Sequence, residues 1–74
     1  MTVKRSLSIK GHRTSISVED AFWKEFQIIA QRQERPIAAL VAEIDSGRPA
    51  ETNLSSAIRL FVLDDLLRRL TPPS

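Results

Sequence analysis

The sequence predicts a mainly α-helical domain that opens with a short β-ribbon and continues with three helices. Polar and apolar side chains alternate up to Val18, which is the period of a strand. After Glu19 the apolar residues recur at spacings of three and four, which is the period of a helix. Proline and glycine then divide the helical part into three segments.

The composition is that of one folded domain, with 42% hydrophobic and 27% charged residues among 74. A chain this short buries a small share of its surface, so its core needs additional support. Because there is no cysteine and only one histidine, disulfides, thiolate metal sites and a zinc site are excluded. We therefore expect no metal and no cofactor, and association into an oligomer is the remaining common source of support.

Nothing in the sequence indicates a membrane partner. No apolar run approaches the roughly 18 residues that span a bilayer, and the N-terminus lacks the apolar segment of a signal peptide. We therefore expect a cytoplasmic protein.

The residues before Gly11 alternate in polarity and predict an outer strand. We expect Gly11 and His12 to form a two-residue turn of type II′, with glycine first. In that register Lys10 lies opposite Arg13, and every apolar side chain of the ribbon falls on one face. The alternative is a solvated basic arm over residues 1–11, because an isolated hairpin is marginal in water.

The next strand presents a polar face and an apolar face. Arg13, Ser15 and Ser17 fall on one side, and Ile16 and Val18 fall on the other, because successive side chains of a strand point in opposite directions.

Three helices are expected after the ribbon. The first starts near Glu19, with either Ser17 or the acidic pair at 19 and 20 stabilising its N-terminus. Pro36 opens the second helix, which runs to about Asp45. The third extends from about Leu54 to Leu70, with Thr52 or Asn53 as its N-cap. We divide the chain into a ribbon and two-helix core over residues 12–46, a third-helix segment over 47–70 and a frayed tail over 71–74.

The third helix carries apolar residues around most of its circumference, which is too wide for a helix that rests on one small core. We expect burial on two sides, with a second copy of the chain or another protein supplying the additional surface.

Charge is distributed unevenly along the chain. Residues 1–18 contain four basic side chains and no acidic one, whereas all nine carboxylates come later. This asymmetry indicates an anionic partner for the N-terminal part. The basic residues are Lys4, Arg5, Lys10 and Arg13.

No pattern indicates an enzyme. The sequence contains no phosphate-binding glycine loop, no nucleophile and base at a recognisable spacing, and no cluster of metal ligands. Asp64 and Asp65 are adjacent on a helix and therefore point in different directions, which favours a solvated face over acid-base chemistry.

The segment RTSISVEDAFWKEFQIIAQRQERPIAALVAEI, from Arg13 to Ile44, resembles the ribbon-helix-helix family of DNA-binding proteins. The strings GHRTSISVEDAFW and NLSSAIRLFVLDDL are similar to those of short bacterial proteins of this family. The resemblance implies an intertwined homodimer in which two strands pair into an antiparallel ribbon that enters the major groove of double-stranded DNA.

Carried over to this sequence, the resemblance implies specific roles. Arg13, Ser15 and Ser17 would contact base edges, because arginine binds guanine and a serine hydroxyl donates or accepts. The basic residues expected to contact phosphate are Lys4, Arg5, Lys10 and Arg35, the last with the amides that follow Pro36. The dimer core would contain Ile16, Val18, Phe22, Phe26, Leu40, Ile44 and Phe61.

Two functions are consistent with these patterns. The first is a homodimeric, sequence-specific DNA-binding regulator that acts as a repressor. The second is a protein-interaction module on the same scaffold, such as an antitoxin-like adaptor that binds another polypeptide through its third helix.

Overall fold

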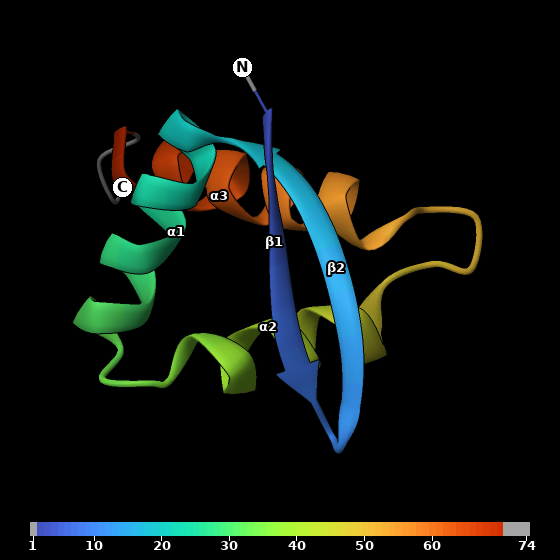
Figure 1. Cartoon of the computed structure of the whole chain (residues 1–74). Coiled ribbons are helices and arrows are strands. Elements are labelled where there is room, and N and C mark those ends of the chain that lie inside the picture. Colours follow the sequence, from blue (N-terminus) through green and yellow to red (C-terminus); the bar gives the residue numbers. More distant parts are fainter. Residues whose placement is uncertain (1, 71–74) are drawn as a thin grey trace.

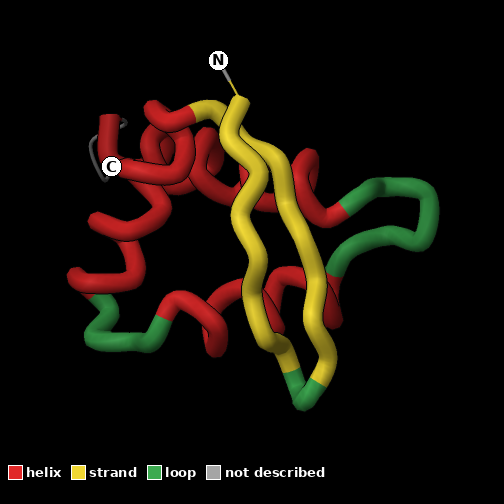
Figure 2. Tube along the Cα trace, in the orientation of Figure 1, coloured by secondary structure: helices red, strands yellow, loops and turns green. Residues whose placement is uncertain are grey.

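The computed structural model describes residues 2–70. Two strands pair into an antiparallel sheet, and three helices follow (Figure 1, Figure 2). This order confirms the predicted fold class, including the third helix and the N-terminal hairpin. The tail expected over residues 71–74 lies outside the described residues. The elements are β1 Thr2–Ile9, β2 His12–Glu19, α1 Asp20–Arg32, α2 Ile37–Gly47 and α3 Leu54–Leu70.

The turn of the hairpin differs from the predicted one. Ile9 pairs with His12, so Lys10 and Gly11 form the turn and His12 is the first residue of β2. Lys10 has a φ of 52° and Gly11 a φ of 79°. Positive φ at both positions is typical of a type I′ turn, whose twist matches that of the flanking strands. The expected pairing of Lys10 with Arg13 was wrong, but a shift of two residues leaves every side chain on its predicted face.

One hydrophobic core lies between the hairpin and the three helices. Ile16 and Val18 of β2 cluster there with Phe26 of α1, Leu40 of α2 and Ile58 of α3. Each of the five is at most 1% exposed. All five belong to the same chain, so a single copy encloses its own core.

The residues expected in a dimer core therefore lie in or beside the core of one chain. Phe22, Ile44 and Phe61 are partly buried and pack against it. The other four are almost completely buried within the single chain. These four are Ile16, Val18, Phe26 and Leu40.

The helices begin where the sequence predicts. Glu19 is the N-cap of α1 by its backbone angles, although no side-chain hydrogen bond caps this helix. α2 follows Pro36 and ends at Gly47, slightly beyond the expected end. Asn53, one of the two residues expected to cap α3, accepts a hydrogen bond of 2.8 Å from a backbone N–H in the first turn.

The three helices cover one side of the hairpin. In Figure 1, α3 passes behind one half of the hairpin, α2 passes behind the half that ends in the turn, and α1 stands at the side. Helix α3 contacts β2, α1 and α2. The third helix is therefore part of the layer that supports the ribbon, and the other side of the hairpin is left to solvent.

Candidate nucleic-acid interface

The solvent side of β2 carries the three residues expected to contact bases. Arg13, Ser15 and Ser17 are exposed, whereas Ile16 and Val18 between and beyond them are buried. The strand is fixed by its apolar face, because burying two β-branched side chains stabilises the fold by roughly 1.5 to 3 kcal/mol each. The three polar side chains that alternate with them consequently point toward solvent.

Strand β1 adds a second row of polar side chains to this face. Each of its outward residues is exposed and lies directly opposite one of the three from β2. Side chains at directly opposite positions point to the same face of a sheet. Between residues 4 and 17 the sequence contains no carboxylate. The pairs are Lys4 with Ser17, Ser6 with Ser15, and Ser8 with Arg13.

Ser6 and Ser8 were not among the residues predicted to contact bases. Their alternation with Leu7 and Ile9 placed them on the polar side, which was the signal available in the sequence. They had no predicted role because the family resemblance began at Arg13. The pairing of β1 with β2 places Ser6 and Ser8 on the same face of the hairpin as the predicted base contacts.

Arg5, expected at a phosphate, lies on the opposite side of the ribbon. Its guanidinium carbon is 4.7 Å from the centre of the Trp23 ring, and its Nη2 is 3.0 Å from Oδ1 of Asp20. Only 25% of the side chain is exposed. The structure therefore places Arg5 against α1 and away from the outer face.

The other residues expected at phosphates occupy three separate places. Lys4 lies on the outer face of the hairpin. Lys10 lies in the turn, and its Nζ donates a hydrogen bond of 2.9 Å to Oγ of Ser46 near the end of α2. Arg35, which precedes α2, forms an ion pair with Glu43. The structure thus brings Lys4 together with the predicted base contacts, and Lys10 lines the same hollow as Arg13. Arg5 and Arg35 are held against α1 and α2 by their ion pairs.

The end of the ribbon is held by Arg59 of α3, a residue without a predicted role. Its Nε is 2.6 Å from Oε1 of Glu19, and its Nη2 donates to the backbone carbonyl of Ser17 at 3.1 Å. The hydrogen bond from Arg59 to the Glu19 carboxyl lowers the pKa of that carboxyl below its ordinary value. The carboxylate at the end of β2 is therefore paired with a cation from α3.

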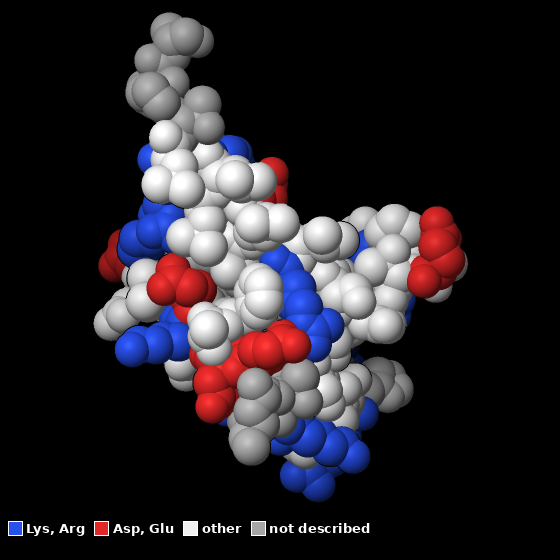
Figure 3. All heavy atoms as spheres, turned by 90° about the horizontal axis from the view of Figure 1, so that it is seen from above, with Lys and Arg blue, Asp and Glu red and all other residues white. Residues whose placement is uncertain are grey.

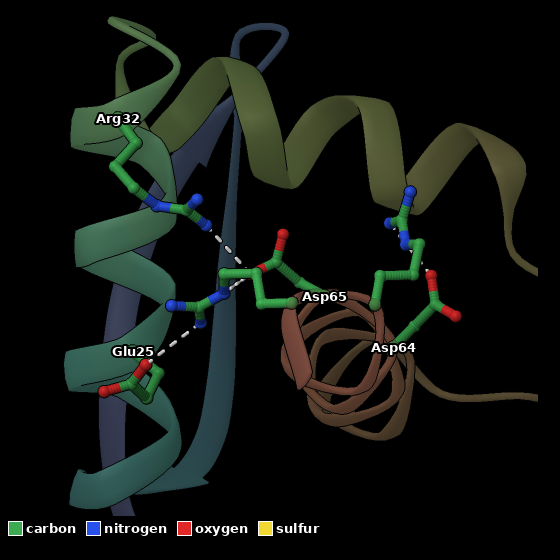
Figure 4. A network of polar contacts seen from close by, with 6 residues as sticks. Glu25, Arg32, Asp64 and Asp65 are labelled. Atoms are coloured by element: carbon green, nitrogen blue, oxygen red, sulfur yellow. Dashed lines mark hydrogen bonds and ion pairs between the residues drawn. The ribbon is translucent and has the colours of Figure 1, made fainter. Parts of the chain in front are cut away.

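A second set of ion pairs ties α1 to α3, at some distance from the ribbon (Figure 4). Asp65 accepts from Arg32 and from Arg69, both at 2.9 Å, and Arg69 also lies 3.4 Å from Glu25. Asp64 points to the other side of α3, where it pairs with Arg68 (Figure 4). The two aspartates diverge as predicted, and each is engaged in an ion pair.

Charges of both signs are mixed on the end of the molecule seen from above. Lysine and arginine side chains lie next to aspartate and glutamate side chains there (Figure 3). The outer face of the hairpin differs, because its described residues between 4 and 17 are basic, hydroxyl-bearing or neutral. Within residues 2–70, no helix has the length and apolar character needed to cross a membrane.

Comparison with known proteins agrees with this architecture. A profile of the ribbon-helix-helix domain matches residues 2–66. The match includes β1 and most of α3, which lie outside the stretch from Arg13 to Ile44 that carries the resemblance in the sequence. Searches of curated proteins and of solved structures gave no significant match. The chain belongs to the ribbon-helix-helix domain family, whose members are generally DNA-binding regulators of transcription and not enzymes.

Proposed function

We propose that this protein is a homodimeric, sequence-specific DNA-binding repressor that inserts its β-ribbon into the major groove. The observation that carries the proposal is the outer face of the hairpin. Both strands expose basic and hydroxyl side chains there, and no carboxylate occurs between residues 4 and 17. A DNA surface that is lined by phosphates would repel an acidic ribbon and attract this one.

The chemistry of these side chains suits base recognition. The major groove admits a two-stranded ribbon, and arginine binds O6 and N7 of guanine with two hydrogen bonds. A serine hydroxyl both donates and accepts, so Ser15 and Ser17 can contact several bases. Arg13 therefore supplies the strongest preference for one base, and the serines adjust the preference at neighbouring positions.

Phosphate contacts would add affinity without sequence preference. Lys4 is exposed on the outer face and is available for this role. Arg5, Lys10 and Arg35 would first have to leave Asp20, Ser46 and Glu43, respectively. Release of Arg35 from Glu43 would cost little, since a surface ion pair contributes only about 0.2 to 1 kcal/mol.

Repression follows from occupancy, because a protein that fills the major groove of a promoter prevents other proteins from binding there. A homodimer would bind two related half-sites, and the operator would then be palindromic. We place the protein in the cytoplasm, where a bacterial operator is accessible.

A protein-interaction module, such as an antitoxin-like adaptor, is the second candidate. The observation that favours it is the set of exposed leucines on α3. A purified chain that forms dimers but has no affinity for any duplex would support the adaptor over the repressor.

The most informative experiment is a selection of bound sequences from random duplex DNA. The repressor predicts enrichment of a short motif with a guanine that depends on Arg13. Arg13→Ala should weaken binding to the selected duplex by about 1 to 3 kcal/mol and relax the preference at that guanine.

Lys24→Ala is a matched control, because it removes one positive charge from an exposed position on α1. It should leave the selected motif unchanged. Affinity should also fall steeply with salt, since each neutralised phosphate releases counterions. Equal loss of affinity for selected and random duplexes in Arg13→Ala would show that Arg13 does not read bases.

A further inference from the structure

A hollow of about 360 Å³ lies at the turn end of the hairpin, where the start of β2 meets the end of α2 and the start of α3. In Figure 1 this is the end of the hairpin that α2 passes behind. The volume is within the range of small-ligand sites, which is roughly 300 to 1,000 Å³. Three cations and a single carboxylate line the hollow. The cations are Lys10, Arg13 and Arg48, and the carboxylate is that of Asp45.

We propose that this hollow, which we call the turn hollow, binds a phosphate group between its three cations. The phosphate is carried either by a free phosphorylated compound or by the backbone of DNA, and the second case rests on the proposed function. Phosphate suits the lining because arginine binds two of its oxygens through two parallel N–H groups, whereas lysine adds a point charge. Arg48 had no predicted role, so the site includes a residue from outside the ribbon.

The single carboxylate of the turn hollow is already paired. Oδ1 of Asp45 lies 2.8 Å from Nε of Arg48, and Nη1 of Arg48 donates to the backbone carbonyl of Thr52 at 2.7 Å. These two contacts use two of the five N–H groups of the guanidinium and hold it in place. Among the described residues, neither Lys10 nor Arg13 forms an ion pair. The lining therefore keeps an excess of positive charge.

Lys10 is an unusual residue for its place in the turn. Its φ of 52° lies in the left-handed region, where a type I′ turn favours asparagine, aspartate or glycine. The side chain extends to α2, where Nζ donates to Oγ of Ser46 at 2.9 Å, and an ammonium has two further protons to donate. Backbone strain of this kind is concentrated at functional sites. The turn itself does not favour lysine, so the strain indicates a role for the ammonium.

Arg13 belongs both to the turn hollow and to the polar outer face of the hairpin. A phosphate in the hollow therefore lies beside the guanidinium that we propose to bind guanine. A backbone phosphate of DNA would add affinity next to the base contact. A free phosphorylated compound would instead compete with guanine for Arg13 and weaken the binding of DNA. The two sources of phosphate thus have opposite effects on the affinity for DNA.

Titration of the isotope-labelled protein with inorganic phosphate, followed by NMR, tests the site without DNA. Sodium chloride at the same ionic strength is the reference, because it screens charges to the same extent. Amide signals around the turn hollow should shift and saturate with phosphate but not with chloride. Lys10→Asn should raise the dissociation constant for phosphate by at least about threefold, because it removes a charge-assisted hydrogen bond. Asparagine before glycine favours the turn, so this variant should keep the fold.

Arg48→Gln is the second variant and should weaken the binding of phosphate to a similar extent. Its circular dichroism spectrum and unfolding midpoint show whether the loop after α2 remains folded. Lys24→Gln is the matched control, since it removes one positive charge from an exposed position on α1. It should bind phosphate as the wild type does. Shifts that do not saturate, or that are equal in the wild type and Lys10→Asn, rule out a site for free phosphate.

Binding to the selected duplex then identifies the source of the phosphate. For the DNA backbone, Lys10→Asn should lower the slope of log affinity against log salt by about one and leave the preference for guanine unchanged. For a free compound, the slope should stay the same, and phosphate should weaken DNA binding by the wild type more than by Lys10→Asn.

The absence of saturable phosphate binding overturns the proposal when Lys10→Asn also leaves the salt slope unchanged or when no duplex binds. Saturable phosphate binding without affinity for any duplex would refute the repressor assignment and support the site. Guanine-dependent DNA binding without either sign of a phosphate site would do the reverse.

Discussion

The two faces of the hairpin are built from alternate residues of the same strands and have opposite roles. On the inner face Ile16 is 1% exposed and fixes the ribbon to the helices. On the outer face its neighbours Ser15 and Ser17 are exposed. Substitutions on the inner face should therefore lower the free energy of unfolding, whereas substitutions on the outer face should lower the affinity for DNA. The difference shows how a small domain holds a row of polar side chains toward solvent by burying the apolar side chains that alternate with them.

The largest effect is expected from Ile16→Ala on the inner face. Removing this side chain from the core should lower the free energy of unfolding by about 2 to 5 kcal/mol, because it deletes buried methyl groups and leaves a cavity. Urea denaturation followed by circular dichroism measures the change. Ser15→Ala is the control from the outer face and should stay within about 0.5 kcal/mol of the wild type. Similar losses in the two variants would refute the division between the faces.

A smaller effect is expected in the turn that joins the strands. Gly11 has a φ of 79°, and no atom beyond its two chain neighbours lies within 4 Å of the place where a Cβ would stand. The cost of Gly11→Ala is therefore one of backbone conformation, about 1 to 2 kcal/mol. Lys10→Asn should have the opposite sign, because asparagine followed by glycine favours a type I′ turn. Thermal unfolding of both variants tests whether the register depends on this turn.

Substitutions of Arg5 and Lys4 distinguish a basic residue on the inner face of the ribbon from one on the outer face. Its position over Trp23 predicts that Arg5→Ala lowers stability by about 0.5 to 1 kcal/mol. The effect stays small because the Nε of Arg5 is buried without a hydrogen-bond partner. Lys4→Ala should instead reduce the salt dependence of DNA binding with little change in stability. If Arg5→Ala changes the salt dependence as much as Lys4→Ala does, then Arg5 contacts phosphate after leaving α1.

The smallest effect concerns pH. Because Arg59 lowers the pKa of Glu19 in the folded chain, the ionised carboxyl stabilises the fold above its ordinary pKa of 4.5. That contribution is lost as the pH falls through the lowered value. The loss of stability between pH 7 and pH 3 should therefore be smaller in Glu19→Gln than in the wild type. Glu51→Gln, which removes an exposed carboxylate from the loop that precedes α3, should behave as the wild type does.

Periodicity alone determined most of the fold. A period of two predicts the ribbon and its faces, and a period near 3.6 predicts the helices, because each period follows from local backbone geometry. Pro36 and Asn53 mark helix starts through chemistry that acts within one turn. For the same reason the alternation of side chains is sufficient to assign Arg13, Ser15 and Ser17 to the solvent side.

Tertiary structure decided the partners of the side chains. The turn at Lys10 and Gly11, the stacking of Arg5 on Trp23 and the contact of Arg59 with Glu19 all depend on how distant segments pack. The width of the apolar stripe on α3 predicts burial on two sides, and packing decided which leucines remain exposed. Local periodicity fixes the direction of a side chain relative to its own backbone, whereas its neighbour is fixed only when the elements pack together.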